Sequence, residues 1–121
     1  MQCPKCYSKM ETVSHSGRSV ERCSLCHGLW FHGDDLAQLR RDKWMAEHVF
    51  DTGDVETGKM YDRIRGIHCP FCEEDMRQGF DDEQPHVMFE SCPQGHGTFL
   101  DAGEFTDLVH KTFWDRFKLI R

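Results

Sequence analysis

Apolar residues recur at helical spacing in two stretches of the chain. In the C-terminal stretch they are Phe105, Leu108, Val109, Phe113, Phe117 and Ile120. In the earlier stretch they form a rougher set, Leu36, Leu39, Ala46, Val49 and Phe50, which Lys43 interrupts. A period near 3.6 residues predicts an amphipathic helix in each stretch. The acidic residues at 101–104 have the form of a capping box, so Asp101 is predicted to be the N-cap of the second helix.

Short segments on either side of turn residues predict one hairpin in each half. In the first half the strands are residues 9–14 and 18–22, around a Ser-Gly turn at 16–17. In the second half they are residues 76–80 and 86–90, around an acidic tip. Gly, Pro, Asp and Ser between such segments are the usual signals of a turn.

The two hairpins belong to an internal repeat. Residues 3–10 match residues 69–76 at Cys, Pro, Cys and Met, with an offset of 66 residues. Residues 20–31 match residues 89–100 with an offset of 69, and the second cysteine motif is part of that match. Each unit therefore has the order knuckle, hairpin, knuckle, helix.

Length and composition favour two small units over one large core. The chain has 121 residues, and 38% of them are hydrophobic. Units of roughly 50 to 60 residues usually need disulfides or metal for stability. We therefore expect a small zinc-stabilised α+β fold of two tandem zinc ribbons. The first ribbon and its helix take residues 1–50, a connector takes 51–67, and the second ribbon with its amphipathic helix takes 68–121.

The cysteine content is the main chemical clue. No apolar leader precedes the first cysteine motif, and no apolar run reaches the roughly 20 residues that span a bilayer. We therefore expect a cytoplasmic protein without membrane association. In that compartment paired cysteines are more often metal ligands than disulfides, and the odd count of seven agrees.

The first half carries a complete set of four cysteines. Two CxxC pairs lie 16 residues apart, which is the spacing of a zinc ribbon, and the predicted ligands are Cys3, Cys6, Cys23 and Cys26. Two thiolates from each knuckle form a tetrahedral site without strain. The alternatives are free buried cysteines, a redox dithiol, or iron bound as in rubredoxin.

The second half has only three cysteines, Cys69, Cys72 and Cys92, because Gly95 stands where the fourth is expected. The next residue, His96, has a longer side chain, and we predict that it completes a Cys₃His zinc site. The glycines on both sides of it give the turn the freedom that this needs. Two zinc ions per chain are expected.

Other interpretations of the second site remain open. His96 is a surface residue like its counterpart His27 in one of them, and the site is then degenerate. In another, three thiolates and a water leave an open position of the catalytic type. Weaker candidates for the fourth ligand are His68, His86 and Asp101.

These motifs resemble the TFIIB-type zinc-ribbon family of small bacterial proteins. The resemblance lies in the CPxC knuckles and in a second knuckle followed by a Gly-aromatic-apolar run and an acidic helix start, as at residues 23–31 and 97–105. It covers roughly residues 2–40 and 68–108. It implies a zinc ribbon with the seven cysteines as ligands, and it implies little about activity.

Three residues depart from the family pattern. His27 stands where the family usually has Gly, His32 where it has Asp, and Gly95 where it has the last cysteine. The fourth ligand of the second site therefore cannot be carried over from the family. The prediction of His96 rests on its chemistry alone.

The charge distribution bears on function. The formal charge is -6, and residues 69–107 carry one basic and ten acidic residues. Two Zn²⁺ bound by seven thiolates take the total to about -9. Nucleic acid binding needs a cationic face, and the sequence offers only a small one on the first ribbon, Lys5, Lys9, Arg18 and Arg22. A transcription-type, nucleic-acid-binding factor is therefore the alternative rather than the main prediction.

No catalytic constellation is evident, so we do not expect an enzyme; a metal- or thiol-dependent activity is the weakest alternative. We expect a protein–protein adaptor or regulatory factor. The C-terminal helix places Trp114 and Leu119 off its apolar stripe, where they offer a docking surface for a partner or for a second copy in a homodimer. The acidic second ribbon suits a basic partner.

Overall fold

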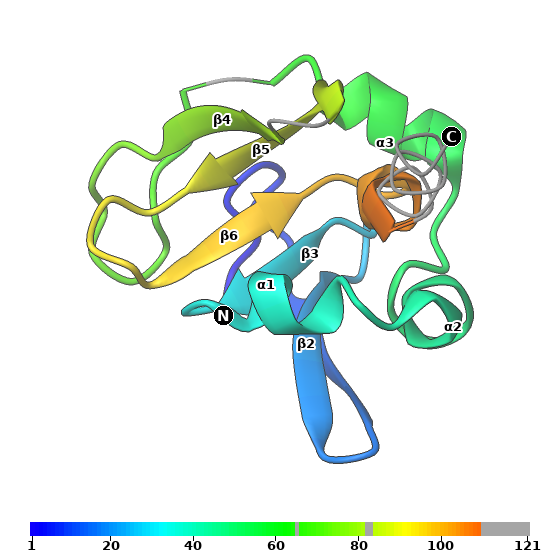
Figure 1. Cartoon of the computed structure of the whole chain (residues 1–121). Helices are drawn as coiled ribbons and strands as arrows, with labels where there is room; N and C mark the ends of the chain where they lie inside the picture. The colour runs from blue at the N-terminus through cyan, green and yellow to red at the C-terminus, as the bar shows by residue number, and fades with distance from the viewer. Residues whose placement is uncertain (65, 82–83, 110–121) are drawn as a thin grey trace.

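The computed structural model describes residues 1–64, 66–81 and 84–109, without the side chains of residues 80, 81 and 84–88 (Figure 1). Residues 104–109 are helical, as predicted. The remainder of the predicted C-terminal helix, with Trp114 and Leu119, lies outside the described residues. None of the helices in the described part of the chain has the length and apolar character needed to cross a membrane.

A six-stranded antiparallel sheet forms the centre of the fold, in the order β1-β2-β3-β6-β5-β4 (Figure 1). Its strands are β1 (Met10–His15), β2 (Arg18–Cys23), β3 (Leu29–His32), β4 (Arg77–Asp81), β5 (Gln84–Ser91) and β6 (Gly97–Leu100). The pairs β1–β2 and β4–β5 are the two predicted hairpins. Strands β3 and β6, which follow the second knuckles, were not predicted. They pair with each other, so the two halves share one sheet.

The shared sheet has an internal two-fold relationship. The repeat offset of 69 residues relates Trp30 to Phe99, and these two residues are paired directly in the β3–β6 ladder. On one side of them Leu29 pairs with Leu100. An antiparallel contact in which equivalent residues meet is the arrangement of a two-fold symmetric interface. A pseudo-two-fold axis therefore passes between Trp30 and Phe99.

Two glycines at the ends of the second knuckles make this contact close. Gly28 and Gly97 are equivalent in the repeat, and each lies under the central aromatic ring of the other half. A Cβ atom on Gly28 would overlap the Phe99 ring, and one on Gly97 would lie 2.5 Å from the Trp30 ring. Such separations are not tolerated, so only glycine fits at both positions.

The two faces of the sheet bury different residues, because successive residues of a strand point to opposite sides. One face carries the main hydrophobic core, formed by Val20, Leu29, Phe31, Leu39, Met45, Ala46, Phe50, Leu100, Phe105, Leu108 and Val109. The other face buries Trp30 and Phe99 among the cysteines, with Met10, Ile67 and Met76. Both candidate metal sites therefore lie on the face of the sheet that carries Trp30 and Phe99.

The predicted helix after the first ribbon is broken into shorter elements. They are α1 (Asp35–Leu39), α2 (Lys43–Met45) and the π-helical turn η1 (Ala46–Phe50). The break falls before Asp42, whose Oδ1 accepts a hydrogen bond from the Met45 N–H at 2.9 Å and caps α2. Lys43, which interrupts the apolar stripe in the sequence, lies at this break.

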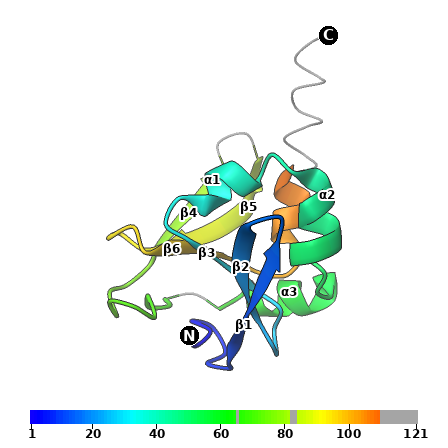
Figure 2. The same cartoon turned by 90° about the horizontal axis from the view of Figure 1, so that it is seen from below.

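The connector contains a helix, α3 (Val55–Tyr61), which was not predicted. Figures 1 and 2 show α3 and α2 beside residues 104–109, on the same side of the molecule. Gly58 makes the contact close, because a Cβ atom there would overlap the carbonyl of Ala102. Part of the segment 51–67 is thus packed against the second half; the predicted domain boundaries themselves stay predictions.

The predicted capping box of the C-terminal helix is only half correct. The Glu104 Oε1 does accept the N–H of Asp101, at 2.7 Å. The carboxylate of Asp101, however, caps nothing, because it is bonded to a lysine of the first half. Asp51, from the connector, takes over the capping and accepts the N–H groups of Gly103 and Thr106, each at 2.8 Å.

Candidate metal centres

The four cysteines of the first half lie together at the base of the β1–β2 hairpin. The sulfur atoms of Cys3 and Cys26 are 3.7 Å apart, and those of Cys6 and Cys23 are 3.3 Å apart. All four sulfurs lie within 4.8 Å of one another. A zinc ion about 2.3 Å from each sulfur of a tetrahedron would hold them about 3.8 Å apart. The arrangement therefore fits a zinc ion with four thiolate ligands.

Backbone N–H groups point at the sulfur atoms, as knuckle turns allow. The N–H groups of Leu25 and Cys26 each lie 3.4 Å from the sulfur of Cys23. The hydrogen bond with Cys26 lowers the pKa of the Cys3 thiol to about 5, although burial opposes that shift. The same hydrogen bond, together with burial, raises the pKa of the Cys26 thiol, and burial raises that of Cys23. Without a metal the cluster therefore favours the thiolate at Cys3, and the thiolate is the form that binds a metal.

The second cluster contains three cysteines and one histidine. The sulfurs of Cys72 and Cys92 are 3.6 Å apart. The Nδ1 atom of His96 lies 3.3 Å from the Cys92 sulfur and 3.8 Å from the Cys69 sulfur. These four ligand atoms also lie within 4.8 Å of one another. The structure therefore brings together all the residues predicted for this site, with Nδ1 as the nitrogen that faces the sulfurs.

A shift of the turn by one residue explains how the histidine reaches the cluster. In the first knuckle the left-handed residue is His27 (φ 61°), and its N–H bonds to the Cys23 carbonyl. In the second knuckle the left-handed residue is Gly95 (φ 82°), and its N–H bonds to the Cys92 carbonyl. The second turn is therefore one residue shorter than the first. As a result the side chain of the following residue, His96, points toward the sulfur atoms.

The other candidates for the fourth ligand lie elsewhere, as far as their side chains are described. The Nε2 of His68 is 2.9 Å from the carboxylate of Asp75 at the surface. Asp101 is bonded to Lys5. The side chain of His86 lies outside the described residues. Of the candidates with described side chains, His96 is the one within the cluster.

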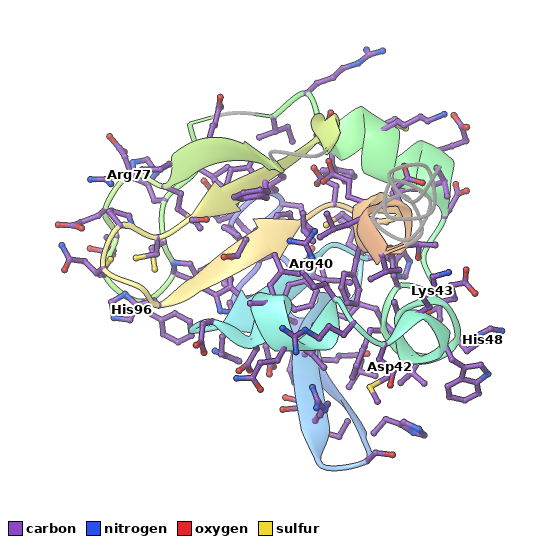
Figure 3. The ribbon with its side chains drawn as sticks, in the orientation of Figure 1. Arg40, Asp42, Lys43, His48, Arg77 and His96 are labelled. Atoms are coloured by element: carbon purple, nitrogen blue, oxygen red, sulfur yellow. The ribbon has the colours of Figure 1, made fainter. Side chains whose placement is uncertain are left out.

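The two clusters differ in exposure to solvent. In the first, three of the four cysteines are buried and Cys6 is half-buried. In the second, His96 is exposed and Cys72 is half-buried. His96 lies just before β6, at the edge of the molecule (Figure 3). The second cluster is therefore open to water on the histidine side.

A buried lysine next to the first knuckle links the two halves. Lys5 lies between the first two cysteines, and its Nζ is 2.6 Å from Asp101 Oδ2, 3.0 Å from the Tyr61 carbonyl and 3.6 Å from Glu90 Oε1. Its side chain has no exposed surface. The prediction that Lys5 belongs to an exposed basic face is therefore wrong, because three acceptors from the connector and the second half surround it.

The rest of the predicted basic face is also reduced. Arg22 donates hydrogen bonds to the carbonyls of Val49 and Phe50 and to the hydroxyl of Thr52. Lys9 and Arg18 are exposed. Two of the four predicted residues thus serve to hold the structure together.

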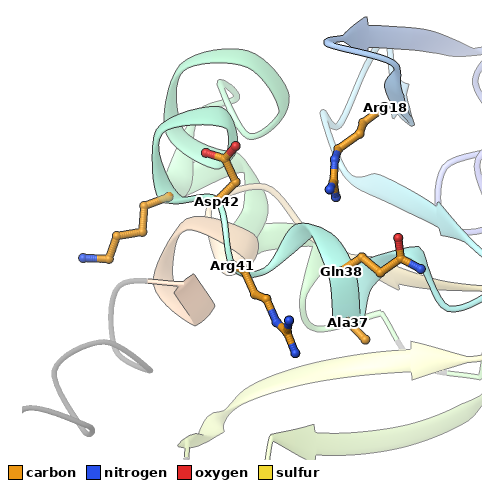
Figure 4. Close-up of a pocket in the computed structure, with 6 residues that line it drawn as sticks. Arg18, Ala37, Gln38, Arg41 and Asp42 are labelled. Atoms are coloured by element: carbon orange, nitrogen blue, oxygen red, sulfur yellow. The ribbon is translucent and has the colours of Figure 1, made fainter.

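A different basic surface exists between the start of β2 and the α1–α2 break (Figure 4). It is an open hollow of about 570 Å³, lined by Arg18, Ala37, Gln38, Arg41, Asp42 and Lys43. Arg18 and Arg41 are exposed, and the two guanidinium groups come from different elements. The sequence did not indicate this hollow, because its residues are brought together by the break between the helices.

The acidic residues around Lys5 form a third polar group. Carboxylate oxygens of Asp62, Asp101 and Glu104 lie within 4.8 Å of one another. Burial, together with the charge of Asp101, raises the pKa of Glu104 to about 9. Because the Lys5 ammonium is bonded to Asp101, this group belongs to the ion pair between the halves.

Two knuckles that face each other across a hairpin, each supplying two cysteines, define a zinc ribbon. Residues 2–42 match the model of the family described as transcription factor zinc-finger, the TFIIB-type zinc ribbon. Residues 2–42 are therefore a TFIIB-type zinc ribbon, and the Cys₃His group lies outside that match. Neither the curated proteins nor the solved structures gave a match.

Proposed function

We propose that this chain is a non-catalytic protein-binding module whose two zinc ions are structural. The observation that carries the proposal is that each cluster offers four protein ligand atoms within 4.8 Å of one another. A zinc ion with four protein ligands has no open position for water or substrate, and such closed sites are typical of structural zinc. The role of the metal is then to hold surfaces in place.

Exposed apolar side chains support a protein partner. The large ones with substantial exposure are Tyr7, Leu25, Trp44, Val55, Met60, Ile64 and Phe71. Aromatic side chains are the commonest anchors of protein interfaces. Trp44 is stacked on His48 at 5.1 Å between ring centroids, and Phe71 lies beside the second cluster. The proposed homodimer through the C-terminal helix concerns residues outside the described part.

A nucleic-acid-binding role is the second candidate, and the hollow at Arg18 and Arg41 is the observation that favours it. Against it, two residues of the basic face expected from the sequence are engaged internally, and the chain has a formal charge of -6 before zinc binding. Phosphate binding depends on many cationic contacts. We therefore place protein binding first.

One experiment separates these candidates. The zinc-loaded protein, carrying an affinity tag, is recovered from its native cell, and the same protein is tested in vitro with a 20-nucleotide single-stranded DNA at low and moderate salt. Our proposal predicts a co-purifying protein that is lost when the metal is removed, and no DNA binding that falls steeply with salt. Steep salt-dependent DNA binding that Arg18→Gln and Arg41→Gln abolish would instead support the second candidate.

A further inference from the structure

The pseudo-two-fold axis relates a surface of the first half to an equivalent surface of the second half. The connector covers the surface of the second half. Helix α3 packs on the turn at residues 102–103, where a Cβ atom on Gly58 would overlap the Ala102 carbonyl and one on Gly103 would lie 3.2 Å from the Val55 side chain. The carbonyl of Tyr61, at the end of α3, accepts a hydrogen bond from the buried Lys5. This face of the second half is therefore closed by a short helix from the chain itself.

The equivalent face of the first half has no such cover among the described residues. The repeat relates Lys5 to Phe71, Asp101 to His32 and Ala102 to Gly33. Phe71 is 50% exposed, whereas Lys5 is buried. A Cβ atom on Gly33 would meet no atom within 4 Å, whereas Ala102 is in tight contact with α3. Within residues 1–64, 66–81 and 84–109, nothing therefore occupies the position on the other side of the axis that is equivalent to that of α3.

We propose that this open face, formed by His32, Gly33, Phe71 and His96 and here called the Phe71 face, is the docking site for a short helix of a partner protein. The helix would lie as α3 lies on the equivalent face. This inference rests on the proposed protein-binding function and names the surface that performs it.

The composition of the Phe71 face indicates the chemistry of the partner. The Phe71 ring centroid lies 5.8 Å from that of Trp30, 5.9 Å from that of His32 and 6.0 Å from that of His96. On the face that α3 covers, the Lys5 ammonium donates a hydrogen bond to the Tyr61 carbonyl. On the Phe71 face the equivalent position is the aromatic ring of Phe71. The partner helix therefore contributes an apolar or aromatic side chain, with a small residue opposite Gly33 as Gly58 is opposite Ala102.

Charge distinguishes the partner from other ligands. The four residues of the Phe71 face include no lysine or arginine, so phosphates of a nucleic acid would find no cation there. A second copy of this chain is also disfavoured as the donor of α3, because that helix is already packed on its own second half. A helix from a different protein is the occupant that the geometry favours.

Docking on this face would be coupled to the second metal site. His96 is both a member of the Cys₃His cluster and an exposed member of the Phe71 face. A bound helix would cover the side on which that cluster is open to water. Loss of the metal would release the knuckle that positions Phe71, so binding of the partner should require zinc at this site.

Site-specific photo-crosslinking tests the inference. The photoreactive residue p-benzoyl-phenylalanine replaces either Phe71 or Trp44, two exposed aromatic residues at different places, and each protein is irradiated in its native cell. The captured protein is then purified and its Kd measured with zinc-loaded wild type, Phe71→Ala and Trp44→Ala. We expect a protein adduct from position 71, at least ~10-fold weaker binding by Phe71→Ala, and less than ~2-fold change with Trp44→Ala.

A metal count accompanies the binding measurement, because Phe71→Ala must keep the zinc content of the wild type for the comparison to be valid. The side chain is exposed and only its backbone N–H bonds to a sulfur, so alanine preserves that contact. Phe71→Leu serves as a conservative variant and should recover most of the affinity.

Each other outcome overturns the inference. An adduct with a second copy of the chain or with nucleic acid, or a partner that binds Phe71→Ala as tightly as wild type, excludes the Phe71 face as the site of a partner helix. An adduct from position 44 alone excludes it too but leaves the proposed protein-binding function intact. No adduct from either position, with no co-purifying protein, excludes both.

Discussion

Lys5 and Asp101, which are 96 residues apart in the chain, form a buried ion pair with 2.6 Å between Nζ and Oδ2. Lys5 comes from the first knuckle of the first ribbon, and Asp101 follows the last strand of the second half. The pair crosses the pseudo-two-fold axis, and its equivalent on the other side is the contact between Phe71 and His32. The first contact is charged and buried, whereas the second is aromatic and the Phe71 ring in it is exposed.

Replacing Lys5 by methionine should destabilise the protein strongly. The Asp101 carboxylate would then remain buried without the Lys5 ammonium, and removal of one partner of a buried pair costs about 3–5 kcal/mol. The measurement is urea unfolding of the zinc-loaded protein, with the exposed Lys9→Met as the control. A loss below about 1 kcal/mol for Lys5→Met would show that the ion pair does not hold the halves together.

Glu104 should make the protein less stable as the pH rises. Its pKa is raised from 4.5 to about 9, chiefly by burial and then by the charge of Asp101. Between these values the folded protein holds a proton that the unfolded chain has lost, so the free energy of unfolding falls with increasing pH. Glu104→Gln keeps an acceptor for the Asp101 N–H and removes this effect.

The free energy of unfolding of Glu104→Gln, relative to that of the wild type, should therefore increase between pH 6.5 and 8.5, by at most about 1.4 kcal/mol per pH unit. Thermal unfolding of the zinc-loaded proteins at several pH values measures it, with the exposed Asp107→Asn as the control. Parallel curves for Glu104→Gln and wild type would contradict the prediction.

Adding a methyl group at Gly28 should disturb the centre of the sheet. The new Cβ would overlap the Phe99 ring from the other half, and overpacking of this kind costs about 1–3 kcal/mol or more. Phe99→Leu in the same molecule should relieve part of the loss. Urea unfolding of both single variants and the double variant measures this. If the double variant loses as much free energy of unfolding as the two single variants together, Gly28 and Phe99 are not in contact.

The two metal sites should release zinc at different rates. His96 is exposed at the second site, whereas the first site has three buried cysteines, so a chelator reaches the second site first. We expect two phases when a coloured chelator is added to the zinc-loaded protein. The fast phase should disappear in His96→Ala and the slow phase should disappear in Cys26→Ser. A single phase in the wild type would contradict the difference between the sites.

Much of the local structure follows from the sequence. The repeat aligns both hairpins, and the structure pairs β2 with β3 and β5 with β6 in equivalent registers, Glu21 with Trp30 and Glu90 with Phe99. The cysteine spacing likewise indicated which residues gather in each cluster. The hairpins depend on residues that are near one another in the sequence, and the clusters depend on the spacing that metal ligands require. Both kinds of pattern can be recognised in a sequence without a structure.

The contacts between the halves were not predictable in the same way. The β3–β6 pairing and the burial of Lys5 depend on how two distant segments meet, which no local pattern specifies. The capping role expected of Asp101 failed for the same reason, because a lysine from the other half binds its carboxylate. The position of α3 was also missed, since the glycine that disfavours a helix, Gly58, is needed for its close packing.

The central claim is that two four-residue clusters each bind one zinc ion. Native mass spectrometry of the purified protein, compared with His96→Ala and Cys26→Ser, tests it most directly. We predict two zinc ions per wild-type chain, with His96→Ala losing zinc from the second cluster and Cys26→Ser losing zinc from the first. A folded wild-type chain that carries one zinc ion or none would contradict the account.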